Sequence, residues 1–289
     1  MSITSDWHIH SRNSCDEASL AVADLIRDAA RHGIRDYGLT DHAHTRCNLP
    51  DIAASREEYL AHDPSPRFHF GVEVSSVSQW EIDEIARGGR GSPTYGLREG
   101  GPPGAPLAIG IAAEDVERLG IEYVVGGAHW PMYVPIEREA VIRDYHRQNM
   151  FLATHPLVDV VAHPWWWWGA WRDSDGMFRR EPWLDDFGAI PRSMHDEFAA
   201  AARQHGKAVE VNIGAMLLNP FYPEPFRRRY VEYLAALKAA GVPLSIGSDC
   251  HSDRYDVEFD RAEEMLATAG VRDDELWRLP PRTDGAHQP

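Results

Sequence analysis

Hydrophobic and polar positions along the chain follow two alternating spacings. Residues 20–31 carry apolar side chains at helical spacing among charged ones, and Gly33 follows, a residue type that commonly ends helices. The short apolar run at residues 35–40 then predicts a strand. The same succession recurs three times, with helices at 114–119, 193–204 and 225–240, glycines at 120, 206 and 241, and strands at 121–125, 207–211 and 242–246.

Three further segments, residues 3–10, 67–74 and 158–162, have the length and apolar content of strands, which brings the predicted strands to seven. Helices that alternate with strands imply a parallel sheet covered by helices. A histidine, aspartate or glutamate falls at or just past the end of every predicted strand, where parallel barrels carry their reactive groups. We therefore predict an α/β fold, a (β/α)7 barrel, in a single domain at residues 1–282.

Two insertions and a tail depart from this pattern. Residues 88–106 are rich in glycine and proline and predict an excursion from the barrel. Residues 164–190 contain six tryptophans and directly follow His163, so we predict that Trp165 lines a substrate pocket; a flap over the core and a dimer contact are the alternatives. Residues 283–289 predict a frayed tail.

Composition restricts the partners of this protein. The 289 residues include 29 lysines and arginines and 45 aspartates and glutamates, a net charge of −16, which does not suit nonspecific binding of nucleic acid or anionic membranes. No stretch approaches the roughly 18 apolar residues of a membrane span, and the first residues do not resemble a signal peptide. The three cysteines lack C-x-x-C spacing, so we expect reduced thiols in a cytoplasmic protein. The partner expected is a small molecule; a homo-oligomer remains open.

Histidines and carboxylates supply the candidate chemistry. In a strand over residues 3–10, His8 and His10 point to the same face, a common arrangement for two metal ligands. Six of the 15 histidines and three carboxylates lie at or near predicted strand ends: His8, His10, His42, His129, His163, His251, Asp16, Glu73 and Asp249. Such a mixed set suits zinc, manganese or iron, and nine candidates imply two or three ions, with Glu73 as a bridge.

Each of these residues also has a structural explanation when it is taken alone. Asp16 could cap the helix that follows it, and His42 could begin a helix behind Asp41. Cys15 and Cys250 are more readily explained as small buried side chains than as ligands. The joint placement of the nine candidates favours the metal site.

Seven short motifs occur in a specific order along residues 3 to about 253. They are D-W-H-I-H, T-D-H, G-V-E, G-G-A-H-W, V-A-H-P, E-V-N and G-S-D-C-H. This set resembles the PHP (polymerase and histidinol phosphatase) family, which implies a distorted, TIM-like seven-stranded barrel and a site for up to three metal ions. The resemblance implies His8, His10, His42, Glu73, His129, His163, Asp249 and His251 as ligands. Asp16 stands where many members have a histidine, and Glu210 is expected to orient a ligand from behind.

The function expected from this resemblance is hydrolysis of a phosphate ester by a metal-activated hydroxide, as in a histidinol phosphatase. Asp249 is the residue predicted to orient the hydroxide. For the phosphate oxygens we expect side chains beside the motifs, namely Arg12, His44, Arg46 and Arg254.

Two other functions fit the same residues. One is hydrolysis of a C–N or C–O bond, as in amidohydrolases, although no lysine is placed to form a carbamylated bridge. The other is a metal-binding interaction domain without activity, which the near-complete ligand set disfavours.

Overall fold

The computed structural model describes residues 2–88, 94–167, 171–172, 178–179 and 184–282. Predictions for the tail at 283–289, for residues 89–93 of the first insertion, and for Trp168, Trp183 and the side chain of Trp171 lie outside the described residues.

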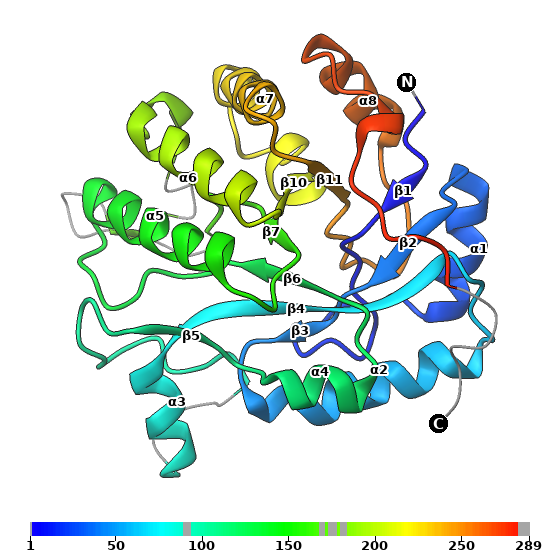
Figure 1. Ribbon diagram of the computed structural model, residues 1–289, viewed down its shortest axis with the longest axis horizontal. Coiled ribbons are helices and arrows are strands. Elements are labelled where there is room, and N and C mark those ends of the chain that lie inside the picture. The colour runs from blue at the N-terminus through cyan, green and yellow to red at the C-terminus, as the bar shows by residue number, and fades with distance from the viewer. Residues whose placement is uncertain (1, 89–93, 168–170, 173–177, 180–183, 283–289) are drawn as a thin grey trace.

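Seven parallel strands form a nearly closed barrel, which confirms the predicted fold (Figure 1). In sheet order they are β1 (Ser5–Asp6), β2 (Asp36–Leu39), β4 (Phe68–Ser78), β6 (Tyr123–Gly127), β7 (Val160–Ala162), β10 (Ala208–Asn212) and β11 (Leu244–Gly247). The last and first strands meet through backbone bonds: Trp7 N–H donates to Ile246 O and Asp249 N–H to His8 O, each at 2.8 Å.

Helices surround the barrel (Figure 1). They are α1 (Val22–His32), α2 (Leu49–Ala61), α3 (Gln79–Ala86), α4 (Ala113–Leu119), α5 (Arg138–Thr154), α6 (Arg192–Gln204), α7 (Glu224–Ala239) and α8 (Phe259–Thr268). Helix α1 buries Val22, Leu25 and Ala29 and ends at Gly33, whose φ of 72° is the left-handed conformation expected there. Gly120 ends α4 in the same way, so the glycine signals identified these helix ends correctly.

The structure corrects several predicted boundaries. Only Ser5–Asp6 of the predicted strand at 3–10 forms a regular ladder. Beyond it, backbone and side-chain acceptors alternate. Trp7 and His10 N–H donate to Ile246 O and Cys250 O, whereas His8 N–H donates to Asp6 Oδ1 at 3.2 Å and Ile9 N–H to Thr40 Oγ1 at 3.1 Å. Strand β4 continues to Ser78 because it pairs with the antiparallel strand β5 (Leu107–Ile109). Four helices, α2, α3, α5 and α8, were not predicted.

Short elements complete the two insertions and the strand ends. His42 lies in β3 (His42–Ala43), which pairs with β4, and does not begin a helix. The second insertion contains the antiparallel pair β8 (Trp171–Arg172) and β9 (Phe178–Arg179), followed by the helical turn η2 (Phe187–Ala189). A π-helical turn, η3 (Ile213–Leu217), follows β10.

The amino end of the barrel is filled by side chains. Trp7 and Tyr123 meet there at right angles, and Trp277 from the last described segment packs 5.4 Å from the Trp7 ring. The Tyr123 hydroxyl donates to Trp7 O at 2.9 Å, and a Cβ at Gly38 would lie 2.0 Å from the Tyr123 hydroxyl oxygen. Glycine at position 38 is therefore required by the tyrosine inside the barrel. In the described part of the chain, no helix has the length and apolar character needed to cross a membrane.

Candidate metal centre

Glu73 occupies the centre of the carboxyl end of the barrel and is completely buried on β4. Imidazoles from several strand ends surround its two oxygens. His42 Nδ1, His8 Nε2 and His10 Nε2 lie 2.9, 3.0 and 3.5 Å from Oε2, and His163 Nε2 and His129 Nε2 lie 2.9 and 3.1 Å from Oε1.

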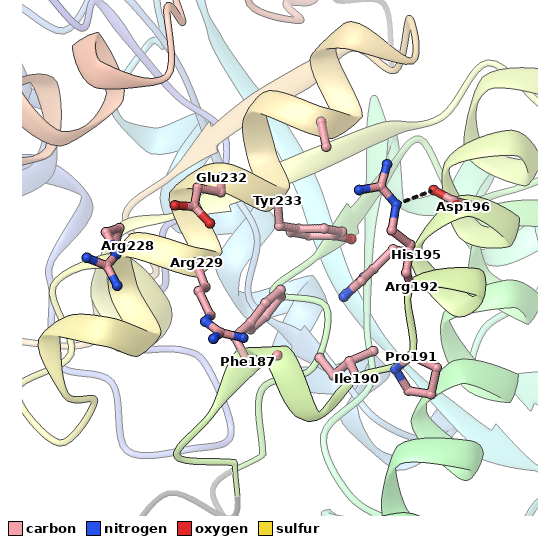
Figure 2. A pocket seen from close by; sticks show the side chains of 12 residues that line it. Phe187, Ile190, Pro191, Arg192, His195, Asp196, Arg228, Arg229, Glu232 and Tyr233 are labelled. Carbon is pink, nitrogen blue, oxygen red and sulfur yellow. Dashed lines mark ion pairs between the residues drawn. The ribbon is translucent and has the colours of Figure 1, made fainter.

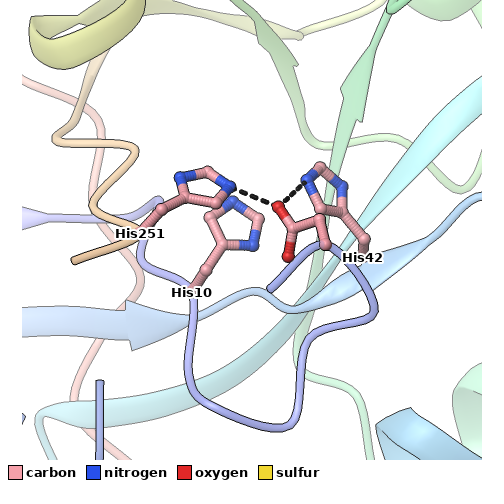
Figure 3. A group of neighbouring side chains, drawn as sticks. His10, His42 and His251 are labelled. Carbon is pink, nitrogen blue, oxygen red and sulfur yellow. Dashed lines mark ion pairs between the residues drawn. The ribbon is translucent and has the colours of Figure 1, made fainter. Parts of the chain in front are cut away.

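Two further carboxylates join this set from loops. Asp16 Oδ2 lies 3.1 Å from His42 Nε2 and 2.5 Å from His251 Nε2 (Figure 3). The His10 ring stacks against each of these two imidazoles, with ring centroids 4.4 Å from His42 and 4.1 Å from His251. Asp249 Oδ1 lies 3.3 Å from His10 Nε2.

All nine side chains predicted as ligands therefore meet at one place. They form four overlapping groups whose donor atoms lie within 4.8 Å of one another: His10, Asp16, His42 and His251; His8, Glu73 and His163; His8, His10 and Asp249; and His42, Glu73 and His129. Each group combines imidazole nitrogens with a carboxylate oxygen, so each can hold a divalent ion.

The backbone is strained where two of these residues are attached. His163 has a φ of 27° and Asp249 a φ of 56°, both positive values that non-glycine residues rarely adopt. Such conformations cost about 1–3 kcal/mol each and are concentrated at functional sites. Here they accompany the turn of the two side chains into the cluster, His163 toward Glu73 and Asp249 toward His10.

The protonation states suit cation binding. Burial raises the pKa of Glu73 and Asp249, but the surrounding imidazoles, led by His8, outweigh burial and hold both pKa values well below the ordinary range. Burial lowers the pKa of His10 to about 3 and that of His129 to about 4. Ionised oxygens and neutral imidazole nitrogens are the forms of these groups that bind metal ions.

His8 and His42 behave differently, because they lie beside carboxylates. Burial opposes their protonation, but the negative charge of Glu73 outweighs it and raises the pKa of His42 to about 10. The pKa of His8 is also raised well above its ordinary value, by Glu73, Glu210 and Asp249 against the effect of burial. A proton and a metal ion therefore compete for these two imidazoles.

Outer contacts fix the orientation of the rings. Glu210 Oε1 lies 2.6 Å from His8 Nδ1, while Oε2 accepts the His163 backbone N–H at 2.7 Å and Asn212 Nδ2 at 3.0 Å. Asn212 Nδ2 also donates to Asp249 Oδ2 at 3.1 Å. Contacts of this kind set the tautomer of a ligand imidazole and direct its other nitrogen toward a metal.

Two buried polar atoms of the described residues, without hydrogen-bond partners, indicate that the site suits a cation. Among the described residues, His10 Nδ1 and Asp16 Oδ1 are buried without a hydrogen-bond partner, and both belong to the group in Figure 3. Buried polar atoms without partners are costly, and a bound cation would offset this cost. The donor set therefore fits divalent metal ions.

The arginines predicted beside the motifs have other contacts. Arg12 pairs with Glu58 of α2 at 3.1 Å, and Arg46 pairs with Asp115 of α4 at 2.9 Å. Their guanidinium groups are thus engaged by helix carboxylates. Arg254 is exposed on the loop after His251.

His44 lies beside the cluster but in none of the four groups. Its ring stacks on that of His42 at a centroid distance of 4.4 Å, and its Nδ1 lies 2.6 Å from Ser75 Oγ. Burial, reinforced by the charges of His42 and His129, holds its pKa well below the ordinary value, so His44 is a neutral neighbour of the ligands.

Trp165 does not line the cluster, contrary to the prediction. It is completely buried, has a φ of 76°, and lies with its ring 6.3 Å from His146 of α5 and 5.7 Å from His195 of α6. The following residue, Trp166, faces the site instead, with its ring 5.1 Å from that of His163. The positive φ at residue 165 turns the first indole into the core and leaves the second at the cluster.

The structure also places residues at the site that the sequence pattern missed. Ser75 Oγ lies 2.8 Å from His129 Nδ1 and links that imidazole to His44. Extending the alternation of β4 by one step from Glu73 would have identified Ser75, because residues two apart share a face.

A groove of about 580 Å³ lies between α6 and α7 (Figure 2). Its lining includes Arg192, Arg228 and Arg229 together with the rings of Phe187, His195 and Tyr233. None of the nine candidate ligands contributes to its walls, so this groove is separate from the metal centre.

No protein-family model matches the chain, and no curated protein sequence matches it either. Among solved structures, a candidate histidinol phosphatase from Listeria monocytogenes superposes with a TM-score of 0.56 at 12% identity, covering 86% of this chain and 95% of that one. At this identity the likeness shows the fold alone. An N-isopropylammelide isopropylaminohydrolase from Burkholderia multivorans (12% identity, 93% of this chain and 70% of that one) and a citrate lyase from Burkholderia xenovorans (16%, 94% and 78%) both reach a TM-score of only 0.40.

Proposed function

We propose that this protein is a metal-dependent phosphomonoesterase of the PHP family, similar to histidinol phosphatases. The observation that carries the proposal is the meeting of nine imidazole and carboxylate ligands around Glu73, in the order in which the motifs occur along the chain. A set of this size suits two or three divalent ions, with zinc, manganese and iron as the candidates.

Divalent ions held by these groups would lower the pKa of a water molecule and neutralise the oxygens of a phosphate ester. Asp249 is the residue that would orient the attacking water. Its Oδ2 accepts a hydrogen bond from Asn212, whereas its Oδ1 lies 3.3 Å from His10 Nε2 on the ionised carboxylate and would accept a hydrogen from that water. The water oxygen forms a new bond to phosphorus, the ester P–O bond breaks, and a proton passes to the departing alcohol.

Glu210 would support this chemistry from behind the ligands. Its contact with His8 Nδ1 leaves His8 Nε2 directed at Glu73, 3.0 Å away. The same carboxylate also holds the backbone of His163, so one side chain positions two of the ligands.

The amidohydrolase alternative is less well supported. The two lysines of the chain lie away from the cluster: Lys207 Nζ donates to Val158 O at 2.6 Å, before β7, and Lys238 Nζ contacts Glu275 at 2.6 Å. Neither lysine is therefore placed to form a carbamylated bridge between metal ions. Glu73 fills the position that such a bridge would take.

The test is phosphate release from p-nitrophenyl phosphate and histidinol phosphate by protein loaded separately with zinc, manganese or iron(II). We expect turnover with at least one metal and none with Asp249→Ala under the same conditions. The absence of turnover of every phosphate ester by fully metallated protein would refute the proposal. Metal analysis of protein purified without chelator identifies the ions present.

A further inference from the structure

Arg98 lies in the first insertion, at a position fixed by its neighbour in the chain. The Leu97 backbone N–H donates to Glu81 Oε1 at 2.6 Å, and Leu97 O accepts the Tyr133 hydroxyl at 3.0 Å. Glu81 is itself completely buried in α3. Both polar groups of the Leu97 backbone are therefore hydrogen-bonded. These bonds fix the position of the adjoining Arg98 backbone, from which the side chain extends.

The Arg98 guanidinium rests on aromatic rings beside the metal centre. Its central carbon lies 4.8 Å from the centroid of Trp130 and 5.3 Å from that of Tyr95. The Trp130 ring is 5.9 Å from that of the candidate ligand His129, and the Tyr95 ring is 5.8 Å from that of His44. The Trp130 ring thus lies between the positive charge of Arg98 and the candidate ligand His129.

The Tyr95 hydroxyl ties the same segment to the ligand-bearing loop. It donates to the backbone oxygen of Cys15 at 2.9 Å, one residue before Asp16. The insertion is therefore attached on one side to α3 and on the other to the loop that supplies a candidate ligand.

Arg98 differs from two of the arginines that lie beside the motifs. Arg12 and Arg46 are paired with carboxylates, whereas Arg98 is exposed and has no ion pair among the described residues. A guanidinium that lies over aromatic rings keeps its N–H donors, which lie in its own plane, for other partners. These donors match the oxygens of a phosphate group in a bidentate arrangement.

We propose that Arg98 binds the phosphate oxygens of the substrate at the mouth of the metal centre. This inference rests on the proposed phosphomonoesterase function and assigns the substrate contact to the first insertion in place of Arg12 and Arg46. Arg98 contacts the phosphate group before and during hydrolysis, so it acts mainly on substrate affinity.

The test compares Arg98→Ala, Arg98→Lys and the control Arg228→Ala, which removes an exposed arginine from the separate groove in Figure 2. Binding of inorganic phosphate to metal-loaded protein is measured by titration calorimetry, and p-nitrophenyl phosphate kinetics are measured in parallel. A hydrogen-bonded charge contact of this kind corresponds to a rise of about 10- to 100-fold in the Kd of phosphate for Arg98→Ala.

Further readouts separate binding from structure. We expect KM to rise with a smaller change in kcat, Arg98→Lys to recover part of the affinity, and metal content and thermal unfolding to match the wild type. Arg228→Ala should leave the Kd of phosphate unchanged. A wild-type Kd of phosphate in Arg98→Ala, or an equal rise in the control, would overturn the inference.

The inference and the proposed function can fail separately. Turnover of phosphate esters together with an unchanged Kd of phosphate in Arg98→Ala refutes the role of Arg98 and leaves the function standing. Phosphate binding that depends on Arg98, in a protein that hydrolyses no phosphate ester, supports the anion site and refutes the function.

Discussion

Replacing Glu210 by glutamine should weaken metal binding while the protein stays folded. The carboxylate accepts hydrogen bonds on both oxygens: from His8 Nδ1 on one, and from the His163 backbone and Asn212 on the other. A glutamine has one accepting oxygen and one donating nitrogen in the same space. It can therefore satisfy only one side of this arrangement.

Either orientation of the amide is unfavourable for a metal. If its oxygen serves His163 and Asn212, its NH2 faces His8 Nδ1 and forces the ring proton onto Nε2, the nitrogen directed at Glu73. If its oxygen serves His8, two donors lose their acceptor. Loss of such an orienting contact reduces metal affinity by about 10- to 100-fold, or roughly 1.4–2.8 kcal/mol.

Glu122→Gln provides a matched control at the opposite end of the barrel. Glu122 Oε2 lies 2.7 Å from His69 Nδ1, and its Oε1 accepts the Phe70 backbone N–H at 2.9 Å, so the chemical change is the same. His69 belongs to none of the metal groups. Competition of each variant with a chromogenic chelator should show weaker metal binding for Glu210→Gln only. Equal affinity of Glu210→Gln and the wild type would contradict the orienting role.

Three further predictions concern the ligands, a buried acid and the closed end of the barrel. His8→Ala or Asp249→Ala should abolish phosphate-ester turnover and lower the metal content measured by plasma mass spectrometry, with native circular dichroism; full activity in either variant means that the residue was assigned wrongly. Burial raises the pKa of Glu81 from 4.5 to about 7, so the folded state binds this proton more tightly than the unfolded state does. The free energy of unfolding should therefore fall as pH rises from about 5 to 8, by up to about 3 kcal/mol, and this decline should be smaller in Glu81→Gln; parallel urea-unfolding profiles for the two proteins would rule this out. Trp277→Ala removes the indole beside Trp7 and should lower the free energy of unfolding by about 2–4 kcal/mol with an unchanged metal content, and an unchanged denaturation midpoint would argue against this packing.

The barrel and the meeting of the candidate ligands were predictable because local signals determine them. The glycines after α1 and α4 end helices in the left-handed conformation, a property of the residue itself. The ligands lie at strand ends, and parallel strands necessarily bring their carboxyl ends to one edge. His8 and His10 could thus be placed near Glu73 although 63 residues separate Glu73 from His10 in the sequence.

Contacts made by loops could not be predicted in the same way. Arg12 and Arg46 lie beside motifs, but their partners Glu58 and Asp115 are 46 and 69 residues away along the chain. Trp165 and Trp166 are adjacent tryptophans, and only the backbone turn at residue 165 decides which indole faces the ligands. These contacts and orientations depend on tertiary packing, which cannot be predicted from hydrophobic periodicity or residue type.

The filled amino end of the barrel restricts the route by which a substrate can enter the site and a product can leave it. In the described part of the chain, Trp7 and Tyr123 fill the interior beneath the candidate ligands and the half-buried Trp277 packs against them, so the barrel is not a tunnel. Whatever reacts at the metal centre must arrive and depart by the same opening. The product that leaves last therefore keeps the next substrate out, and its departure sets an upper limit on the rate of repeated turnover.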